Sequence, residues 1–351
     1  MSADASSIPS APLSRATPGW SVSDIRVVRY ALGATVAMGI ALGAPWETSY
    51  LTPVLVATFL AFPGTPITPA LGAKLVAVVG GAIYVGWQVG HLVAYPALFL
   101  ILASLLLFWI FYAGQRGLPA LVILWLVIAV TAIPFARMVY PAAAVLVARG
   151  LLLDVVLTAV IVVCAYGLLP EKSTGDAEPA AEGNGPSVAS PDDAFRTALI
   201  GIVVVVPVVA LFYLYELSGA LTVLAYVAIL SSLPDLGTDI EAGKERIRGN
   251  LAGGLVAVLV YNLVSLVPIF PFLLLLTLLA CLALGSRAFR NGTPDSFFVT
   301  ACSTTLLIIG GTAFQGEASS EVYLRVLQIT IAVTYVVLGF EFMNRRIPRL
   351  R

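Results

Sequence analysis

The chain has 351 residues, of which 60% are apolar and 11% are charged, and its formal net charge is zero. A soluble domain carries about 25% charged residues, so this chain has too few polar side chains to cover a surface that faces water. The composition therefore excludes an ordinary soluble protein and a basic nucleic-acid-binding protein, and it predicts that the protein lies in a lipid bilayer.

Six membrane-spanning helices are predicted in the first half of the chain, residues 24–168. Residues 1–23 lack the apolar stretch of a secretory signal peptide, so we expect them to form a cytoplasmic tail. A span takes about 20 apolar residues, because each helical residue advances about 1.5 Å through roughly 30 Å of hydrocarbon. The segments that meet this requirement are 24–44, 48–63, 70–90, 92–112, 117–135 and 146–168.

A second set of six helices follows a polar linker. Residues 169–193 are rich in Pro, Gly, Ser and acidic residues, which is typical of a solvated, flexible segment. The second half, residues 194–343, has apolar segments at 194–214, 218–233, 248–267, 270–288, 293–311 and 322–343, and residues 344–351 form a C-terminal tail. The sequence therefore predicts an all-α integral membrane protein of about twelve transmembrane helices.

The positively charged residues orient these helices in the membrane. With the N-terminus inside and twelve alternating spans, the 19 Lys and Arg residues all fall on the cytoplasmic side except Arg137, Arg149 and Arg325. Cytoplasmic loops of membrane proteins carry such an excess of positive charge. We therefore expect a multi-pass protein of a bacterial inner membrane, with both termini and the linker in the cytoplasm.

The two halves share residue landmarks in the same order, which indicates an internal repeat. The matched positions are Arg29-Tyr30-Ala31-Leu32 with Arg196-Thr197-Ala198-Leu199, Leu51-Thr52 with Leu221-Thr222, Lys74 with Arg248, Gly117-Leu118-Pro119 with Gly292-Thr293-Pro294, and Arg149 with Arg325. Because six is an even number, both six-helix halves enter the membrane from the same side, and the repeat is parallel. A pseudo-twofold axis along the membrane normal would place a pore or a substrate cavity at the centre.

These landmarks resemble the fusaric acid resistance and aromatic acid exporter superfamily. Its halves begin with an Arg-x-x-Leu-like helix, pass through a turn containing Trp and a short second helix, and reach a Gly-rich third helix after a basic residue. Here the first half has Arg29-Tyr30-Ala31-Leu32, Pro45-Trp46-Glu47, Leu51-Thr52, and Lys74 before Gly80-Gly81. The second half has Arg196-Thr197-Ala198-Leu199, Leu221-Thr222, and Arg248-Gly249-Asn250 before Gly253-Gly254.

The resemblance covers nearly the whole membrane region and implies export of small organic anions, often aromatic carboxylates, usually with a periplasmic membrane-fusion adaptor as partner. Plant aluminium-activated malate channels look similar in the membrane and use two six-helix subunits where this chain has two halves. One departure is the linker, which spans only residues 169–193 where larger exporters of the group carry a sizeable cytoplasmic domain. The chain therefore resembles a compact member of the kind classed as a domain of unknown function.

Ionisable residues within or beside membrane spans are costly and are therefore candidates for function. The basic residues that the repeat pairs are Arg29 with Arg196, Lys74 with Arg248, and Arg149 with Arg325. Around a central axis they would form cationic layers that attract an anion. Alternatively, these side chains lie at helix ends, where they reach the lipid headgroups and fix the orientation, and this is the preferred interpretation for Arg29 and Arg196.

Asp154 stands in a long apolar run, five residues after Arg149. That separation is a rotation of about 500°, which leaves the two side chains about 140° apart around the helix and excludes a direct pair. We expect Asp154 to have a partner on another helix or a role in proton coupling. The second half has no acid at the matching position, where Gln328 is the nearest polar residue, and this asymmetry favours a transporter over a symmetric pore.

The second helix of each half is unusually short. Leu51–Phe62 provides twelve residues before Pro63, and Ala220–Leu233 provides fourteen before Pro234. Paired short segments interrupted by Pro in corresponding positions mark the substrate site in many transporters. The predicted lining residues are Thr52 and Thr222, and the alternative is a pair of ordinary helices whose ends are misplaced.

The sequence offers no motif for catalysis or for a cofactor. It has neither a phosphate-binding GxxxxGK[ST] loop nor a GxSxG nucleophile elbow. Cys164, Cys281 and Cys302 lie far apart along the chain and His91 is the single histidine, so we expect neither a metal site nor a disulfide framework. The protein is therefore not expected to be an enzyme or to need a cofactor.

The first hypothesis is an exporter of small organic anions that draws on the proton gradient or on the membrane potential. The second is a non-transporting membrane scaffold that holds an adaptor or an envelope enzyme. The third is a passive anion channel, in which flux would follow voltage and would not depend on a pH gradient.

Overall fold

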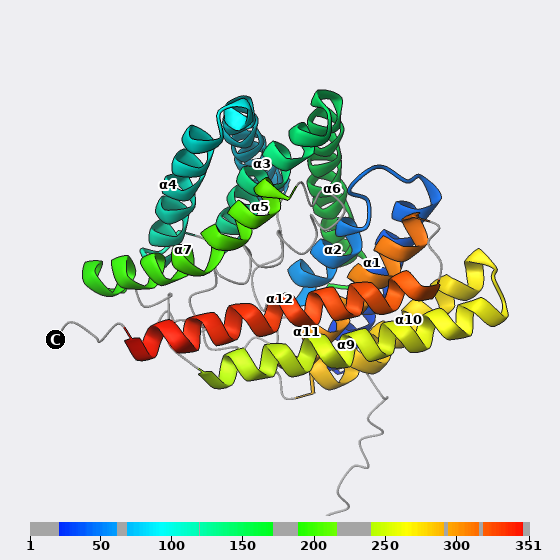
Figure 1. Cartoon of the computed structure of the whole chain (residues 1–351). Coiled ribbons are helices and arrows are strands. Elements are labelled where there is room, and N and C mark those ends of the chain that lie inside the picture. The colour runs from blue at the N-terminus through cyan, green and yellow to red at the C-terminus, as the bar shows by residue number, and fades with distance from the viewer. Residues whose placement is uncertain are drawn as a thin grey trace, which may run out of the picture.

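The computed structural model describes residues 21–61, 69–118, 120–170, 189–215, 240–290, 294–315 and 319–346. These residues form helices joined by turns, without a β-strand among them (Figure 1). The helices are α1 (Val22–Gly43), α2 (Leu51–Ala61), α3 (Pro69–Gly90), the 3-10 turn η1 (His91–Ala94), α4 (Pro96–Gln115), α5 (Ala120–Val139), α6 (Pro141–Leu168), α7 (Pro191–Leu214), α9 (Ile240–Leu266), α10 (Phe270–Ala288), α11 (Ser296–Gln315) and α12 (Ser319–Arg346). The predicted helix at 218–233 lies outside the described residues.

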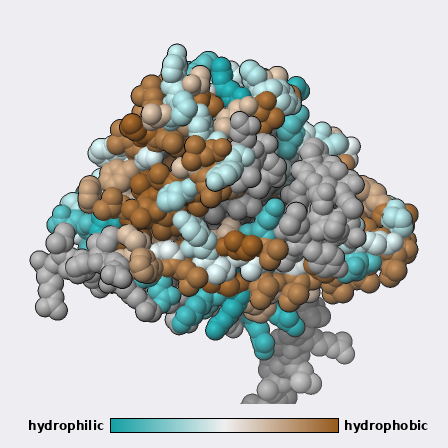
Figure 2. All heavy atoms as spheres, viewed as in Figure 1, coloured by the Kyte–Doolittle hydropathy of each residue, from teal (hydrophilic) through white to brown (hydrophobic). Residues whose placement is uncertain are grey.

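Eight of the described helices, namely α1, α3 to α7, α9 and α10, are long and apolar enough to cross a membrane. Their outward faces carry large apolar side chains such as Leu32, Ile101 and Leu255, which are 44%, 67% and 63% exposed. Apolar residues cover much of the face shown in Figure 2, where a soluble protein would present charge. The protein is therefore an all-helical, multi-pass membrane protein.

Local chemistry sets where the helices begin. Ser21 and Asp24 form a capping box on α1, in which the Ser21 hydroxyl accepts the Asp24 N–H (3.1 Å) and the Asp24 carboxylate accepts the Ser21 N–H (3.0 Å). The helix α6 starts at Pro141 rather than near residue 146, and Pro is favoured in the first turn of a helix. The helix α9 is already formed at Ile240, before the predicted start at residue 248.

The helices form two groups that cross each other. In Figure 1, α9, α10 and α12 run across the lower part of the molecule, and α3, α4 and α6 stand across them in the upper part. The helices α1 and α2 connect the groups, because α1 packs against α10 and α6, and α2 packs against both α6 and α11. The short helix α2 therefore lies at the junction of the two groups.

The same helix pairs recur in the two predicted halves. The third helix of each half packs against the fifth and the sixth, as α3 does with α5 and α6 and as α9 does with α11 and α12. Across the halves, α1 packs against α10 and α4 packs against α7. Glycine permits close approach in both third–fifth pairs, since a Cβ at Gly86 or at Gly253 would collide with the carbonyl oxygen of Ala129 or of Ala301.

Both ends of the linker are bonded to helix ends. At its start, Arg29 of α1 donates from Nη1 to the carbonyl oxygen of Leu169 (3.1 Å). At its end, Arg116 donates from Nη1 to the carbonyl oxygen of Ala189 (2.9 Å), and the Ala189 N–H donates to the carbonyl of Gln115 (3.2 Å). The chain therefore leaves and re-enters the helical body at fixed points.

Candidate functional site

Asp154 of α6 is fully buried and accepts three hydrogen bonds from the segment that joins α1 to α2. Its Oδ1 accepts from Trp46 Nε1 (3.0 Å) and from Thr52 Oγ1 (2.6 Å), and its Oδ2 accepts from Thr48 Oγ1 (2.5 Å). All three donors are uncharged. We call these four residues the Asp154 cluster.

Consecutive tight turns bring the donors together. The N–H groups of Ser49, Leu51 and Thr52 donate to the carbonyl oxygens of Trp46, Thr48 and Ser49 at 3.0, 2.8 and 3.1 Å. This coiling leads directly into α2 and puts Thr48 and Thr52, four residues apart, on one side of the segment. On the facing helix, a Cβ at Gly150 would collide with the Thr48 hydroxyl, so the glycine one turn before Asp154 lets the segment lie against α6.

Hydrogen bonding makes the burial of Asp154 tolerable. A carboxylate in an apolar environment is costly unless its oxygens are satisfied, and an ionised Asp offers about four lone-pair positions, of which the cluster fills three. Without the carboxylate each donor would lose its hydrogen-bond partner, and an unpaired buried donor costs about 1–3 kcal/mol of folding free energy. The cluster therefore fixes the α1–α2 segment to α6.

The helix that follows the cluster is central. The described part of α2 has eleven residues and spans about 16 Å, roughly half of the hydrocarbon thickness. Most of its side chains are buried, because it packs against α1, α6 and α11. Its predicted end at Pro63 and the counterpart with Thr222 in the second half lie outside the described residues.

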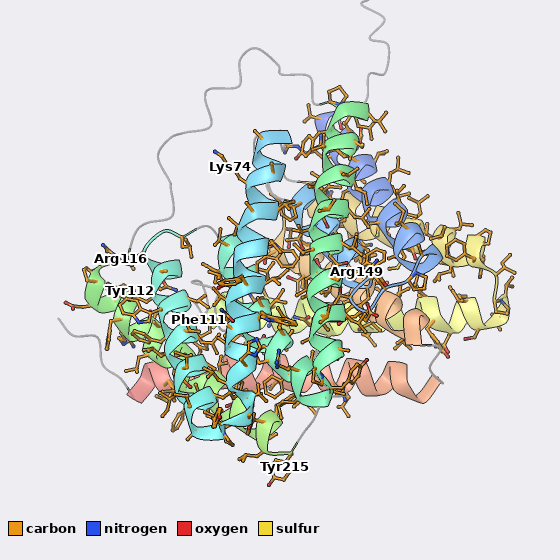
Figure 3. The ribbon with its side chains drawn as sticks, turned by 90° about the horizontal axis from the view of Figure 1, so that it is seen from above. Lys74, Phe111, Tyr112, Arg116, Arg149 and Tyr215 are labelled. Carbon is orange, nitrogen blue, oxygen red and sulfur yellow. The ribbon has the colours of Figure 1, made fainter. Side chains whose placement is uncertain are left out.

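The exposed basic residues do not form internal layers in the described part of the chain. Lys74, Arg149 and Arg248 are all exposed, and Lys74 points away from the neighbouring helices in Figure 3. Arg196 is half-buried on α7, and Arg325 lies on α12 with its side chain outside the described residues. Among the basic residues predicted to line a path for an anion, Arg149 is therefore the strongest candidate, because it lines a groove.

Arg29 lies inside the protein, so the preferred interpretation of a side chain that reaches the headgroups is wrong for this residue. It is only 2% exposed, and its guanidinium lies 3.9 Å from the centre of the Tyr166 ring while it donates to Leu169. The last carbonyls of α6 carry a partial negative charge, and an aromatic face also attracts a cation. The first turns of α1 therefore bind the end of α6.

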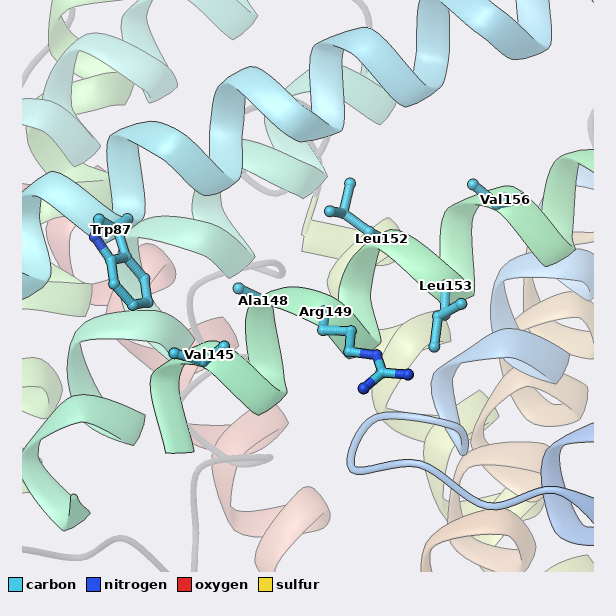
Figure 4. Close-up of a pocket in the computed structure, with 7 residues that line it drawn as sticks. All are labelled: Trp87, Val145, Ala148, Arg149, Leu152, Leu153 and Val156. Carbon is cyan, nitrogen blue, oxygen red and sulfur yellow. The ribbon is translucent and has the colours of Figure 1, made fainter. Parts of the chain in front are cut away.

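A shallow groove of about 370 Å³ lies between α3 and α6 (Figure 4). It is lined by Trp87, Val145, Ala148, Arg149, Leu152, Leu153 and Val156. Arg149 is the one charged residue of this lining, and in Figure 4 its guanidinium points away from Trp87. The other six lining residues are aliphatic or aromatic, so the walls of the groove are apolar.

Aromatic and basic side chains continue beyond the groove at the ends of α3 and α5. The guanidinium of Arg137 lies 5.4 Å from the centre of the Trp87 ring, and His91 makes an edge-on contact with the same ring at 6.0 Å.

Across the described residues, no group of three or more His, Cys, Asp or Glu side chains is placed to hold a metal ion.

A second buried polar cluster joins α9 to α11. Thr304 Oγ1 donates to Asn250 Oδ1 (2.7 Å), the Asn250 amide donates to the carbonyl of Arg246 (2.8 Å), and Thr305 Oγ1 donates to the carbonyl of Gly253 (3.0 Å). We call Asn250, Gly253, Thr304 and Thr305 the α9–α11 cluster. Interhelical hydrogen bonds of this neutral kind hold membrane helices together.

Two of the cysteines meet in space although they are separated in sequence. The Sγ atoms of Cys281 on α10 and Cys302 on α11 lie 3.7 Å apart, and both thiols are buried and free. Their distance along the chain predicts that the two thiols lie apart. That inference fails here because α10 and α11 are consecutive helices that pack against each other.

The sequence predicts Asp154 and Thr52 as site residues but does not predict their partners Trp46 and Thr48. The sequence predicts for Trp46 an interfacial or packing role besides its place in the Pro45-Trp46-Glu47 turn, and Thr48 is not among the predicted site residues. The signal was the spacing of Thr48 and Thr52, which places two hydroxyls on one face at the start of a helix. Nothing in the sequence indicated that this face meets α6.

Two family models match the chain, one in each half. Residues 26–165 match a protein of unknown function (DUF2955), and residues 207–339 match the family described as fusaric acid resistance protein-like. The predicted resemblance to the fusaric acid resistance family is therefore confirmed for residues 207–339, in the second half of the chain. No curated protein and no solved structure matches the chain. The family match implies a membrane transporter of the efflux type in a lipid bilayer, and so points away from an enzyme.

Proposed function

We propose that the protein exports small organic anions of the aromatic carboxylate type from a bacterial cytoplasm. The observation that carries the proposal is the match of residues 207–339 to a fusaric acid resistance-like family, in a chain with eight helices of membrane-spanning length. Fusaric acid is itself an aromatic carboxylic acid. The protein would lie in the inner membrane with both termini in the cytoplasm, and a periplasmic membrane-fusion adaptor is the proposed partner.

The proposed architecture consists of two parallel six-helix repeats, residues 24–168 and 194–343. The recurring helix pairs support it, since α3 with α5 and α6 corresponds to α9 with α11 and α12, and the contact of α1 with α10 corresponds to that of α7 with α4. The two family matches, 26–165 and 207–339, also fall one in each repeat. The recurring helix pairs favour one duplicated unit over twelve unrelated helices.

The groove between α3 and α6 is the proposed contact site for the anion. The Arg149 guanidinium would bind the carboxylate, and Trp87 with the aliphatic residues of α6 would contact the aromatic ring. Lys74 and Arg248, on the proposed cytoplasmic side, would raise the local concentration of anions before entry. The absence of a matching acid for Asp154 in the second half favours a carrier over a symmetric passive channel.

The test is efflux from liposomes that contain the purified full-length protein and are preloaded with salicylate, benzoate or succinate. We expect efflux of the two aromatic anions, a slower rate for Arg149→Gln, and an unchanged rate for Arg290→Gln, which replaces an exposed arginine outside the groove. Arg149→Lys separates charge from geometry, because Lys keeps the charge and loses the two-pronged hydrogen bonding.

Each alternative function predicts a different result in the same assay. Absence of flux for every anion under pH and voltage gradients would contradict the proposal and favour the scaffold. Flux that follows voltage, ignores the pH gradient and survives loss of Asp154 would favour the passive channel. Unchanged efflux in Arg149→Gln together with Lys74→Gln and Arg248→Gln would remove the basic residues from the path.

A further inference from the structure

The two oxygens of the Asp154 carboxylate differ in what their partners can do. Oδ1 accepts from the indole N–H of Trp46, which can only donate, so this oxygen has to remain an acceptor. Oδ2 meets the hydroxyl of Thr48 at 2.5 Å, and a hydroxyl can either donate or accept. A proton on Oδ2 would reverse the direction of that bond and leave both heavy atoms in place.

The surroundings of Asp154 support both of its charge states. Three uncharged donors stabilise the carboxylate, and the buried apolar setting stabilises the neutral acid. We infer that the Asp154 cluster is a proton-binding site that couples export to the proton gradient, with Oδ2 as the atom that takes the proton. This inference rests on the proposed transport function. The step forms an O–H bond on Oδ2 with a proton from hydronium, which becomes water, and no electrons are exchanged.

The helices around Asp154 bring no second ionisable group into the cluster. Glu47 in the same segment and Arg149 on the same helix are exposed. The described helices α2 and α11 contain no Asp, Glu, Lys, Arg or His. The charged residues of the other packed helices lie toward their ends or are exposed, namely Asp24, Arg26 and Arg29 of α1, Lys74 of α3 and Arg137 of α5.

The Asp154 cluster lies where a structural change on protonation would reach the second half of the chain. Tyr50, between the donors Thr48 and Thr52, contacts α11 so closely that a Cβ at Gly310 would lie 3.3 Å from its Cα. The helix α2, which begins at the end of this segment, packs against both α6 and α11. A shift of the segment on protonation would therefore move the junction between the two halves.

The experiment compares wild type with Asp154→Asn, Thr48→Val and, as a control, Thr131→Val, whose buried hydroxyl bonds only carbonyls of its own helix. The Asn amide reproduces the protonated acid, because its oxygen accepts from Trp46 and Thr52 and its nitrogen donates to Thr48. We expect Asp154→Asn to fold and to exchange salicylate at equal pH. It should lose the accumulation that a pH gradient drives in wild type and in Thr131→Val.

Infrared spectroscopy of the purified protein provides a measurement that does not depend on transport. We expect a neutral carboxyl C=O band that titrates over a pH series in wild type, is absent in Asp154→Asn, and titrates with a different midpoint in Thr48→Val. If wild type moves no salicylate, the proposed function fails and this titration still decides the proton site. Gradient-driven accumulation by Asp154→Asn, or a band that does not titrate, would overturn the proton site and leave the transport function standing.

Discussion

The two buried polar clusters perform the same structural task with different chemistry. The Asp154 cluster joins α6 to the α1–α2 segment through a carboxylate, and the α9–α11 cluster joins its helices through an amide, hydroxyls and a backbone carbonyl. The neutral cluster keeps the same bonds at every physiological pH, whereas the carboxylate has two charge states. The difference separates a permanent helix contact from one that a proton can modify.

The largest expected effect is on the Asp154 side of this comparison. Asp154→Ala strands the Trp46, Thr48 and Thr52 donors together, and each unpaired buried donor costs about 1–3 kcal/mol, so the loss of stability should be about 3 kcal/mol or more. Thermal unfolding of the detergent-purified protein measures it, with Asp154→Asn expected to lie much closer to wild type. Equal stability of Asp154→Ala and wild type would show that the cluster does not fix the segment.

The second-largest expected loss of stability is in the α9–α11 cluster, and its cause is packing. In Gly253→Ala the new Cβ meets the Ala301 carbonyl, and overpacking a tight contact costs about 1–3 kcal/mol. Gly80→Ala is the matched control, since a Cβ there has no neighbour within 4 Å, and Ala is the better helix former by about 1 kcal/mol. The prediction is contradicted if both variants unfold at the same temperature.

A smaller effect is expected at Arg29, which stabilises the far end of the helix that carries Asp154. Arg29→Ala removes the bond to Leu169 and the contact with the Tyr166 ring, at about 1–2 kcal/mol. Arg290→Ala should change the unfolding temperature little, because this exposed side chain has neither contact. If the two variants lose the same stability, the buried position of Arg29 contributes nothing.

The smallest expected loss of stability tests the comparison between the two clusters directly. Thr304→Val removes the hydroxyl that bonds Asn250, and side-chain hydrogen bonds between membrane helices average about 0.6 kcal/mol. The loss should be the same at every pH at which the protein is folded, whereas the effect of Thr48→Val should change with pH because its partner titrates. Unfolding measured over a pH series distinguishes them, and identical pH profiles would contradict the comparison.

The sequence predicts the parts of this fold that depend on local composition. The length of the apolar segments predicts most of the helices that the structure describes. The same reasoning identified Asp154 as an acid that needs a partner beyond its own helix. It could not name Trp46 and Thr48, since they lie more than 100 residues away and only tertiary packing decides which turn meets α6.

Two wrong predictions share a physical cause. The position of Arg29 near a helix start predicts a contact with lipid headgroups, and the spacing of Cys281 and Cys302 predicts that they lie apart. In both cases the neighbouring helix supplies the contact, through the end of α6 for Arg29 and through the packing of α10 on α11 for the thiols. Position along one helix does not reveal what the next helix brings to it.

The anchored linker ends have a consequence for how such proteins diversify. Leu169 is held by Arg29 and Ala189 by Arg116, so the path of the chain through the membrane is fixed before the linker begins and after it ends. Insertions between these points would leave the helical body unchanged. A lineage could therefore acquire or discard a whole cytoplasmic module here in a single genetic event, with little selection against intermediate lengths.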